Sequence, residues 1–250
     1  MALEVLFTPA DFAALRQRDL GETVCIAFDV LRATSSMVTA LHHGAAALIP
    51  VEEIPEALEL RRRSPGLLLA GERQGLLIDG AQTGEAPFDF GNSPREFTRE
   101  KVAGRTIAIT TTNGTRALRA CQGAKRVLVG SLLNLGSTVT RLQAEHPSNT
   151  LVVCSGTFEE AAYEDVLAAG ALCDLVWPGD PSGIADSALM ARELYRQAAT
   201  DLGSALSRAR NGRKLLSNPD LREDVAFCAQ RDAMPTAVEM LPGGRVVAWR

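Results

Sequence analysis

The chain has 250 residues, with 26 lysines and arginines against 30 aspartates and glutamates, which gives a formal net charge of −4. Apolar residues make up 46% of the chain, enough to bury a sizeable core, so a disordered protein is excluded. A dedicated nucleic-acid binder is also disfavoured, because such proteins are usually basic and aromatic residues are scarce here. The acidic balance does not exclude a small anionic ligand, since local basic residues can bind one.

The cysteines and the N-terminus predict the cellular setting. Five cysteines are present, none of them in a C-x-x-C pair, so neither a disulfide framework nor a zinc knuckle is expected. A reducing, cytoplasmic location fits that pattern best. The sequence contains no run of 18 apolar residues and no basic stretch followed by a long apolar one, so we expect neither a membrane helix nor a secretory signal.

Short apolar runs alternate with helix-like stretches along most of the chain. The runs that predict strands are 3–7, 23–29, 46–51, 67–70, 106–110, 126–129 and 151–154. The stretches that predict helices are 9–16, 34–43, 55–63, 114–121, 135–145 and 159–175. Strands that alternate with helices predict a largely parallel sheet covered on both faces.

Three segments depart from that rhythm. Residues 71–93 are rich in Gly, Asp, Asn and Pro, which predicts a long loop with one short strand at 76–79; loops of this length are usually functional or disordered. After a Pro/Gly-rich turn at 177–183, residues 184–229 are predicted to be helical, with breaks at Asn211-Gly212 and Asn218-Pro219. A hairpin is expected around Pro242-Gly243-Gly244.

The predicted fold class is therefore α/β. We expect three layers, with a mainly parallel or mixed sheet flanked by helices and with C-terminal strands that add antiparallel edges. A single catalytic unit over 1–250 is the first choice, and the alternative is two lobes with a seam near 176–183. The helical segment after that seam is a candidate for a homodimer contact.

In open α/β sheets, ligands bind beyond the carboxyl ends of the strands, so the residues after each predicted strand are the candidate site. The segment 29–36 follows the second strand and precedes a helix, whose free N–H groups favour an anion. Asp29 can hold a divalent cation, and Arg32 can bind two phosphate oxygens at once. The alternative is a helix cap with a local ion pair.

Two further strand ends carry similar residues. Glu72 and Arg73 follow the strand at 67–70, although neighbouring acids and bases are common on surfaces. The segment 110–116 (TTTNGTR) follows the strand at 106–110, and its hydroxyls, amide and N–H groups predict an anion site. It is not a Walker A loop, because the G-x-x-x-x-G-K-[ST] spacing is absent. The alternative is a hydroxyl-rich helix cap.

The strand at 151–154 is followed by Ser155-Gly156-Thr157 and then by an acidic helix. Glu160 and Glu164 are four residues apart and share a face of that helix, where like charges are unfavourable unless a cation is near. Glu164 and Asp165 are therefore candidate metal carboxylates, and the alternative is a solvated acidic face at a helix N-terminus. Cys154 is not expected to be a nucleophile, because position 160 lacks the arginine of a C-x5-R phosphatase loop.

Together these segments resemble the 2-phosphosulfolactate phosphatase family. The matching segments run in order over most of the chain: 29–41 (DVLRATSSMVTAL), 71–75 (GERQG), 88–94 (FDFGNSP), 110–118 (TTTNGTRAL), 154–157 (CSGT), 164–170 (EDVLAAG), then Asn211-Gly212, Asp224, Cys228, Asp232 and Pro235. The resemblance implies a magnesium-dependent acid phosphatase that hydrolyses 2-phospho-3-sulfolactate to 3-sulfolactate and phosphate, a step of coenzyme M biosynthesis in methanogens. It also implies that related 2-hydroxyacid phosphates are accepted.

The candidate residues can be given roles in that chemistry, in which a metal ion and arginines stabilise the charge on the phosphoryl group. The expected catalytic residues are Asp29, Arg32, Arg73 and Asp165. The expected Mg²⁺ ligands are Asp29, Glu72, Glu164 and Asp165. The expected contacts to phosphate and substrate are Thr34, Ser35, Thr111, Thr112, Asn113, Thr115, Ser155 and Gly156. Attack by a metal-activated water and attack by Asp29 itself are both open.

The partner would then be a small phosphorylated hydroxyacid, with neither nucleic acid nor a membrane involved. Two rival functions fit parts of the pattern. A haloacid-dehalogenase-type phosphatase would also use Asp29, but Leu31 stands where its D-x-D-x-[TV] signature needs the second aspartate. A non-catalytic binding protein for a small phosphorylated or sulfonated hydroxyacid would use the anion site alone, and it would gain nothing from Asp29, Glu164 and Asp165.

Overall fold

Ten strands form a mixed sheet in the part of the chain that the computed structural model describes, residues 1–177 and 179–249. Their order across the sheet is β1-β8-β2-β7-β9-β10-β3-β6-β4-β5. In that order, the strands span Ala2–Leu6, Asn149–Cys154, Thr23–Phe28, Arg126–Gly130, Val238–Met240, Val246–Ala248, Ala47–Pro50, Thr106–Thr110, Leu68–Arg73 and Leu76–Leu77.

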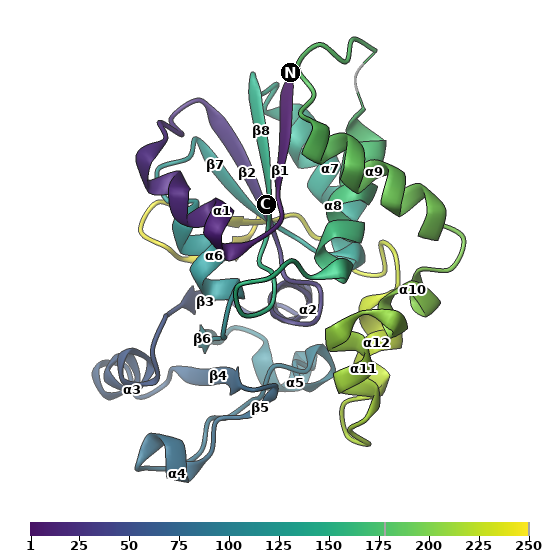
Figure 1. Cartoon of the computed structure of the whole chain (residues 1–250). Helices are drawn as coiled ribbons and strands as arrows, with labels where there is room; N and C mark the ends of the chain where they lie inside the picture. Colours follow the sequence, from purple (N-terminus) through teal and green to yellow (C-terminus); the bar gives the residue numbers. More distant parts are fainter. Residues whose placement is uncertain (178, 250) are drawn as a thin grey trace.

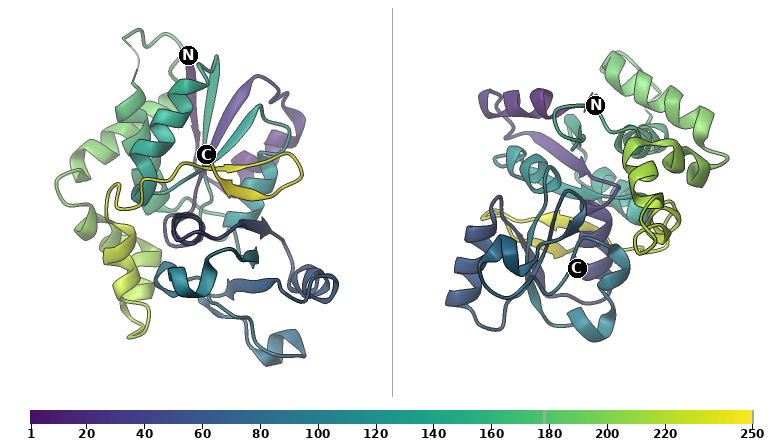
Figure 2. Two further views of the ribbon diagram at one scale, coloured as in Figure 1. Left: turned by 180° about the vertical axis from the view of Figure 1, so that it is seen from behind. Right: turned by 60° about the horizontal axis from the view of Figure 1, so that its bottom comes forward.

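The sheet consists of two parallel halves whose strand directions are reversed along the sheet, but the second half lies across the first, so the carboxyl ends of both can meet. β1, β8, β2 and β7 pair in parallel, and so do β3, β6 and β4. The hairpin of β9 and β10 lies between the halves, and the three antiparallel pairings from β7 to β3 reverse the strand direction. Figure 1 shows the strands of the second half turned across those of the first, and Figure 2 shows the hairpin between them.

The C-terminal strands were expected to be antiparallel, and they are, but their expected position at the sheet edges is wrong. Val238, Met240 and Val246 are buried, as residues of central strands usually are. The turn between the two strands is the expected one, and the Gly244 N–H donates to the carbonyl oxygen of Leu241 at 2.9 Å. A short apolar hairpin in the sequence does not reveal which strands will flank it, and this is why the position was missed.

Helices cover both faces of the half that contains β2, which confirms the three-layer α/β class (Figure 1). Alternate β2 residues face opposite ways: Ile26 and Phe28 belong to the core under α7, α8 and α9, whereas Cys25 and Ala27 belong to the core under α1, α2 and α6. The helices α1 to α12 span Pro9–Ala13, Ala33–His42, Ile54–Arg63, Gly80–Thr83, Arg99–Val102, Gly114–Ala120, Leu135–Ala144, Tyr163–Val176, Asp186–Ala198, Leu202–Arg208, Arg210–Leu216 and Glu223–Cys228. None of the helices in the described residues is long and apolar enough to cross a bilayer.

Two local predictions are wrong. The helix expected at 159–175 begins only at Tyr163, because the preceding residues form a tight turn in which the Thr157 N–H donates to the Glu160 carbonyl oxygen at 2.8 Å. The long loop at 71–93 contains a short helix, α4, besides the expected strand β5. Asp79 caps α4 by accepting the N–H groups of Ala81 and Gln82.

The break expected at Asn211-Gly212 is also absent, since α11 runs through both residues. Gly212 instead allows α10 and α11 to pack closely, because a Cβ at this position would lie 1.9 Å from the carbonyl oxygen of Leu206. The second expected break, at Asn218-Pro219, is confirmed between α11 and α12. The glycine therefore marks a close helix contact, and not a helix end.

We predict that Gly212→Ala destabilises the protein, because α10 and α11 must separate to accommodate the new methyl group. The free energy of unfolding should fall by about 1–3 kcal/mol or more, as measured by urea denaturation. Gly66→Ala is the matched control, since nothing lies within 4 Å of a Cβ there. Equal stabilities of the two variants would contradict the close contact.

Candidate active site

A cavity of about 540 Å³ lies where the carboxyl ends of the two sheet halves meet. Residues after β2 and β8 line it from the first half, and residues at the ends of β4 and β6 line it from the second. The halves approach closely here, because a Cβ on Gly114 at the start of α6 would lie 2.7 Å from Asp29 Oδ2. The predicted site residues that line the cavity are Asp29, Arg32, Glu72, Arg73, Thr111, Thr112, Asn113 and Gly156.

Asp29 is partly buried at the end of β2 and is held by the start of α2. Its Oδ1 accepts the N–H of Ala33 at 3.0 Å. The Thr34 hydroxyl donates to the Asp29 carbonyl oxygen at 2.9 Å, so this hydroxyl shapes the turn and does not line the cavity. Burial raises the pKa of Asp29 to about 7, and the charges of Glu72 and Glu164 act in the same direction.

Asp165 and Glu164 lie behind the cavity wall. The two oxygens of Asp165 accept the N–H groups of Val30 at 2.8 Å and Gly156 at 3.2 Å, so this buried carboxylate joins the ends of β2 and β8. Glu164 Oε1 accepts the side-chain amide of Asn211 at 2.6 Å, which connects α8 to α11. Burial raises the pKa of both carboxyls, and for Asp165 the charges of Asp29 and Glu164 raise it further.

Glu72 organises the opposite wall. Its Oε1 accepts both the N–H and the hydroxyl of Thr112 at 2.9 Å, and its Oε2 accepts the N–H of Gly75 at 2.6 Å. Arg73 donates to the carbonyl oxygens of Glu72 at 2.8 Å and of Glu52 at 3.2 Å. Among the described residues Arg73 forms no ion pair, so its positive charge is available to an anion in the cavity.

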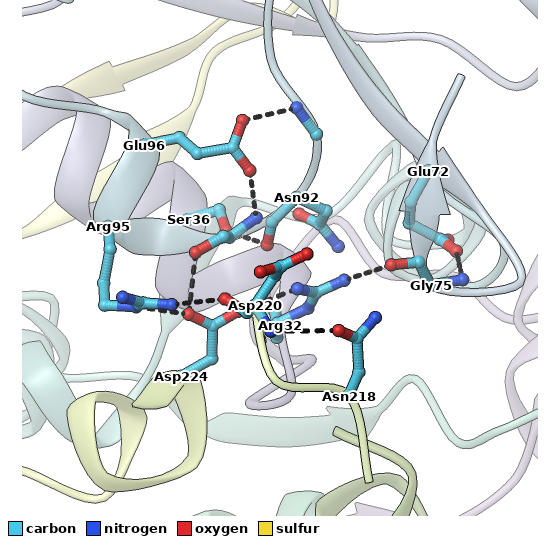
Figure 3. A network of polar contacts seen from close by, with 12 residues as sticks. Arg32, Ser36, Glu72, Gly75, Asn92, Arg95, Glu96, Asn218, Asp220 and Asp224 are labelled. Carbon is cyan, nitrogen blue, oxygen red and sulfur yellow. Dashed lines mark hydrogen bonds and ion pairs between the residues drawn. The ribbon is translucent and has the colours of Figure 1, made fainter. Parts of the chain in front are cut away.

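Arg32 belongs to a buried ionic network that the sequence did not predict (Figure 3). Its Nη1 donates to Asp224 Oδ2 at 2.7 Å, and its Nη2 donates to the Gly75 carbonyl oxygen at 2.8 Å. Asp224 Oδ1 accepts the Ser93 hydroxyl and Arg95 Nε, both at 2.7 Å. Asp224 is fully buried on α12, and its only signal in the sequence was its place among the segments of the family resemblance.

Most of the hydroxyl and amide groups that were predicted to contact phosphate form hydrogen bonds within the protein. Thr111 Oγ1 accepts the N–H of Thr115 at 3.3 Å, and Asn113 Nδ2 donates to the carbonyl oxygen of Phe158 at 3.0 Å. Ser35 donates to the Val30 carbonyl oxygen at 2.8 Å. Of the predicted residues, Thr34, Ser35, Thr115, Ser155, Glu164 and Asp165 do not line the cavity. The Ser155 hydroxyl is buried and has no hydrogen-bond partner among the described residues.

The remaining wall is helix α11, which the sequence prediction omitted. Arg210, Asn211 and Lys214 line the cavity from this helix. Arg210 pairs with Glu160, whereas Lys214 forms no ion pair with any described residue. A polar helix face normally predicts exposure to solvent, and the only signal in the sequence was the place of Asn211 among the segments of the family resemblance.

The side chains at the cavity fit a magnesium ion that is bound by few carboxylates. The described residues contain no group of three or more Asp, Glu, His or Cys side chains arranged to hold a metal. Magnesium, however, is commonly bound by one or two carboxylates together with waters and substrate phosphate oxygens. Asp29, which lines the cavity and whose Oδ1 is held by the Ala33 N–H, can supply such a carboxylate.

The fold and the cavity together define an α/β protein with carboxylates and arginines gathered around one cavity at its strand ends. The profile of the family described as 2-phosphosulpholactate phosphatase matches residues 11–241, and the chain belongs to this family. Its relatives include proteins named "Probable 2-phosphosulfolactate phosphatase" from Symbiobacterium thermophilum, 37% identical over 92% of this chain and 95% of the relative, and from Clostridium novyi, 30% identical over 96% and 97%. The family resemblance drawn from the sequence is confirmed, and the family is one of phosphoric monoester hydrolases.

We predict that Asp224→Asn strongly destabilises the protein, because it leaves the buried Arg32 without its counter-charge. The unfolding free energy should fall by about 3 kcal/mol or more, since breaking one side of a buried ion pair leaves an uncompensated charge. Asp220→Asn is the matched control: this neighbouring side chain is exposed, and Arg95 binds only its carbonyl oxygen. A loss no greater than that of the control would show that Asp224 does not hold the network.

A second prediction concerns pH. A carboxyl whose pKa is about 7 in the folded protein and about 4 in the unfolded chain retains a proton only in the folded state between those values. Raising the pH from 4 to 7 therefore lowers stability through Asp29, and Asp29→Asn removes that contribution. Urea unfolding in EDTA should show the variant gaining stability over the natural protein between pH 5 and pH 7.5. A difference that stays constant with pH would contradict the raised pKa.

Proposed function

We propose that the protein is a magnesium-dependent phosphatase that hydrolyses 2-phospho-3-sulfolactate, or a related 2-hydroxyacid phosphate, to the hydroxyacid and phosphate. The observation that carries this proposal is the meeting of Asp29 with Arg32 and Arg73 around one cavity, in a chain of this family. A substrate with a phosphate, a carboxylate and a sulfonate needs several cationic groups, and the cavity supplies them beside a carboxylate. The names of the relatives support the same substrate.

The residues of the chain divide the work of binding and reaction. Arg32 and Arg73 would hold phosphoryl oxygens, because guanidinium groups match them in geometry and charge. Thr112 donates both its backbone N–H and its hydroxyl to Glu72, so this pair would fix the wall beside the phosphate and would not bind the phosphate itself. Asp29 would hold Mg²⁺ together with waters and substrate oxygens, and the metal would neutralise charge on the phosphoryl group when bound; Glu72 and Glu164 would add only the attraction of their nearby charge.

Asp29 is also the residue nearest to the chemistry. The Ala33 N–H fixes Oδ1, which leaves Oδ2 to act toward the phosphorus. Two routes use this arrangement: Oδ2 orients an attacking water, or Oδ2 attacks phosphorus and the resulting acyl phosphate is hydrolysed in a second step. In both routes the bond that breaks joins phosphorus to the ester oxygen of the substrate, and a proton restores the hydroxyl of the hydroxyacid.

Asp165 supports Asp29 without lining the cavity. Its two oxygens hold the N–H groups of Val30 and Gly156, so it would fix the loops that follow β2 and β8 on either side of the substrate. We therefore assign it a positioning role, in place of the catalytic and metal-binding roles that the sequence suggested.

A cytoplasmic location is also part of what we propose, and the cysteines support it. All five are free and buried, as expected of a chain that works under reducing conditions. Burial also raises the pKa of the Cys154 thiol well above its usual value, which supports an inert structural role. The homodimer and the division into one unit or two lobes stay predictions.

We predict that Asp29→Asn lowers phosphate release from 2-phospho-3-sulfolactate by about 100-fold or more, because it removes the carboxylate nearest the phosphoryl group. EDTA should abolish the activity of the natural protein, and added Mg²⁺ should restore it. Asp220→Asn serves again as the exposed control. Near-full activity of Asp29→Asn would refute the assignment, and binding without any phosphate release by the natural protein would favour the non-catalytic alternative.

A further inference from the structure

One corner of the cavity brings two cations to the same piece of backbone. If Gly75 carried a Cβ, it would lie 3.6 Å from Lys214 Nζ and 4.0 Å from Arg32 Nη2. Gly75 has φ of 85°, in the region that favours glycine, and its lack of a side chain leaves this corner open. A Cβ would fill space that lies between an ammonium and a guanidinium group.

The two cations differ in how their charge is balanced. Arg32 is paired with the buried Asp224 at 2.7 Å. On the cavity side of α11, Arg210 is paired with Glu160. Lys214 has no carboxylate partner among the described residues, so its charge faces the cavity without compensation. This exposed lysine beside an open corner can therefore bind an anion that the phosphate-binding residues do not.

A second, independent feature of the same cavity points to a ligand. Asn92 is only 5% exposed and lines the cavity, yet its Oδ1 is buried with no hydrogen-bond partner. Its side-chain amide makes no hydrogen bond to any described residue, whereas its backbone carbonyl oxygen is bound by Ser36. Buried amides are nearly always satisfied, so an unsatisfied one at a cavity wall indicates a missing partner. Because the side chain makes no hydrogen bond to a described residue, a half-turn of the amide breaks none and presents the Nδ2 N–H groups, in place of Oδ1, to an anionic partner. Figure 3 shows Asn92 beside Arg32, above Gly75.

We propose that Lys214 and Asn92 form a subsite for a second anionic group of the substrate, the sulfonate. This inference rests on the proposed function and names the part of the cavity that recognises the sulfonated end. In 2-phospho-3-sulfolactate the phosphate and the sulfonate are carried by adjacent carbons, so both groups must bind close together. Arg32 lies near both groups of the substrate, and Lys214 and Asn92, which line the same cavity, would offer N–H groups to the sulfonate oxygens.

Different residues would bind the sulfonate and carry out the chemistry at phosphorus. Lys214 and Asn92 come from α11 and from the loop before Pro94, whereas Asp29 follows β2. Loss of the ammonium should therefore weaken binding of the sulfonated substrate and leave the rate of the bound complex almost unchanged. The KM of a substrate without the sulfonate should stay the same.

The test compares 2-phospho-3-sulfolactate with 2-phospholactate, which keeps the phosphate and the carboxylate but lacks the sulfonate. Lys214→Gln should raise KM for the sulfonated substrate about 10-fold with kcat within about twofold, and should leave KM for 2-phospholactate within about twofold. Lys214→Arg should restore most of the loss. Arg213→Gln is the matched control, because it removes one positive charge from the same helix at an exposed position outside the cavity.

Asn92→Ala provides a second variant that removes no protein hydrogen bond of the side chain, and it should shift the two KM values in the same selective way. An equal rise of KM for both substrates would overturn the proposal, because Lys214 would then bind the phosphate or the carboxylate. Unchanged KM values for both would overturn it as well.

Binding without turnover separates this proposal from the proposed function. Isothermal titration with 3-sulfolactate should show about 10-fold weaker binding to Lys214→Gln than to the natural protein, and equal binding would overturn the subsite. If the natural protein released phosphate from neither substrate, the proposed function would fail, and the titration alone would decide the subsite.

Discussion

The candidate site depends on one buried carboxylate, Asp224. It accepts Arg32 on one oxygen and Arg95 and Ser93 on the other, so it joins α12 to the loop after β2 and to the segment before α5 (Figure 3). Arg32 continues the chain of contacts to the Gly75 carbonyl oxygen. Gly75 in turn donates to Glu72, which holds Thr112. A charge that is expensive to bury therefore helps to fix the loop after β2, the Glu72–Gly75 turn and Thr112 relative to one another.

The buried carboxylates at and behind the cavity wall differ from Asp224, because they have no cationic partner in the described part of the chain. Burial raises the pKa of Asp29, Glu164 and Asp165, and none of them pairs with an arginine or lysine among the described residues. A folded chain gains no stability from carboxylates that repel one another, and such clusters occur mainly where function requires them. A divalent cation would compensate the repulsion, and this is the physical reason to expect magnesium beside Asp29 and not beside Asp224.

The parts of the site that the sequence predicted lie at the ends of strands. A nearly continuous apolar run such as 23–28 marks a buried strand, and the polar residue after it must lie at the sheet edge, so Asp29 and Thr112 were found. The sequence did not show that the two sheet halves run in opposite directions, because strand order depends on contacts between distant segments. Asp224 and Lys214 were missed for the same reason: each lies on a short helix whose partner is far away in the chain.

The opposed halves also explain how reaction and selectivity can lie on different elements. Carboxyl ends from both halves converge on one cavity, so the strand ends alone provide Asp29, Glu72 and Arg73. The side that they leave open is closed by α11, a helix packed on α10 through Gly212 and joined to α8 by the bond between Asn211 and Glu164. Lys214 can therefore change without disturbing the sheet. The net charge of −4 is a sum over the whole chain, so it does not show that buried acids lie at the strand ends while an unpaired lysine lies on the helix that faces them.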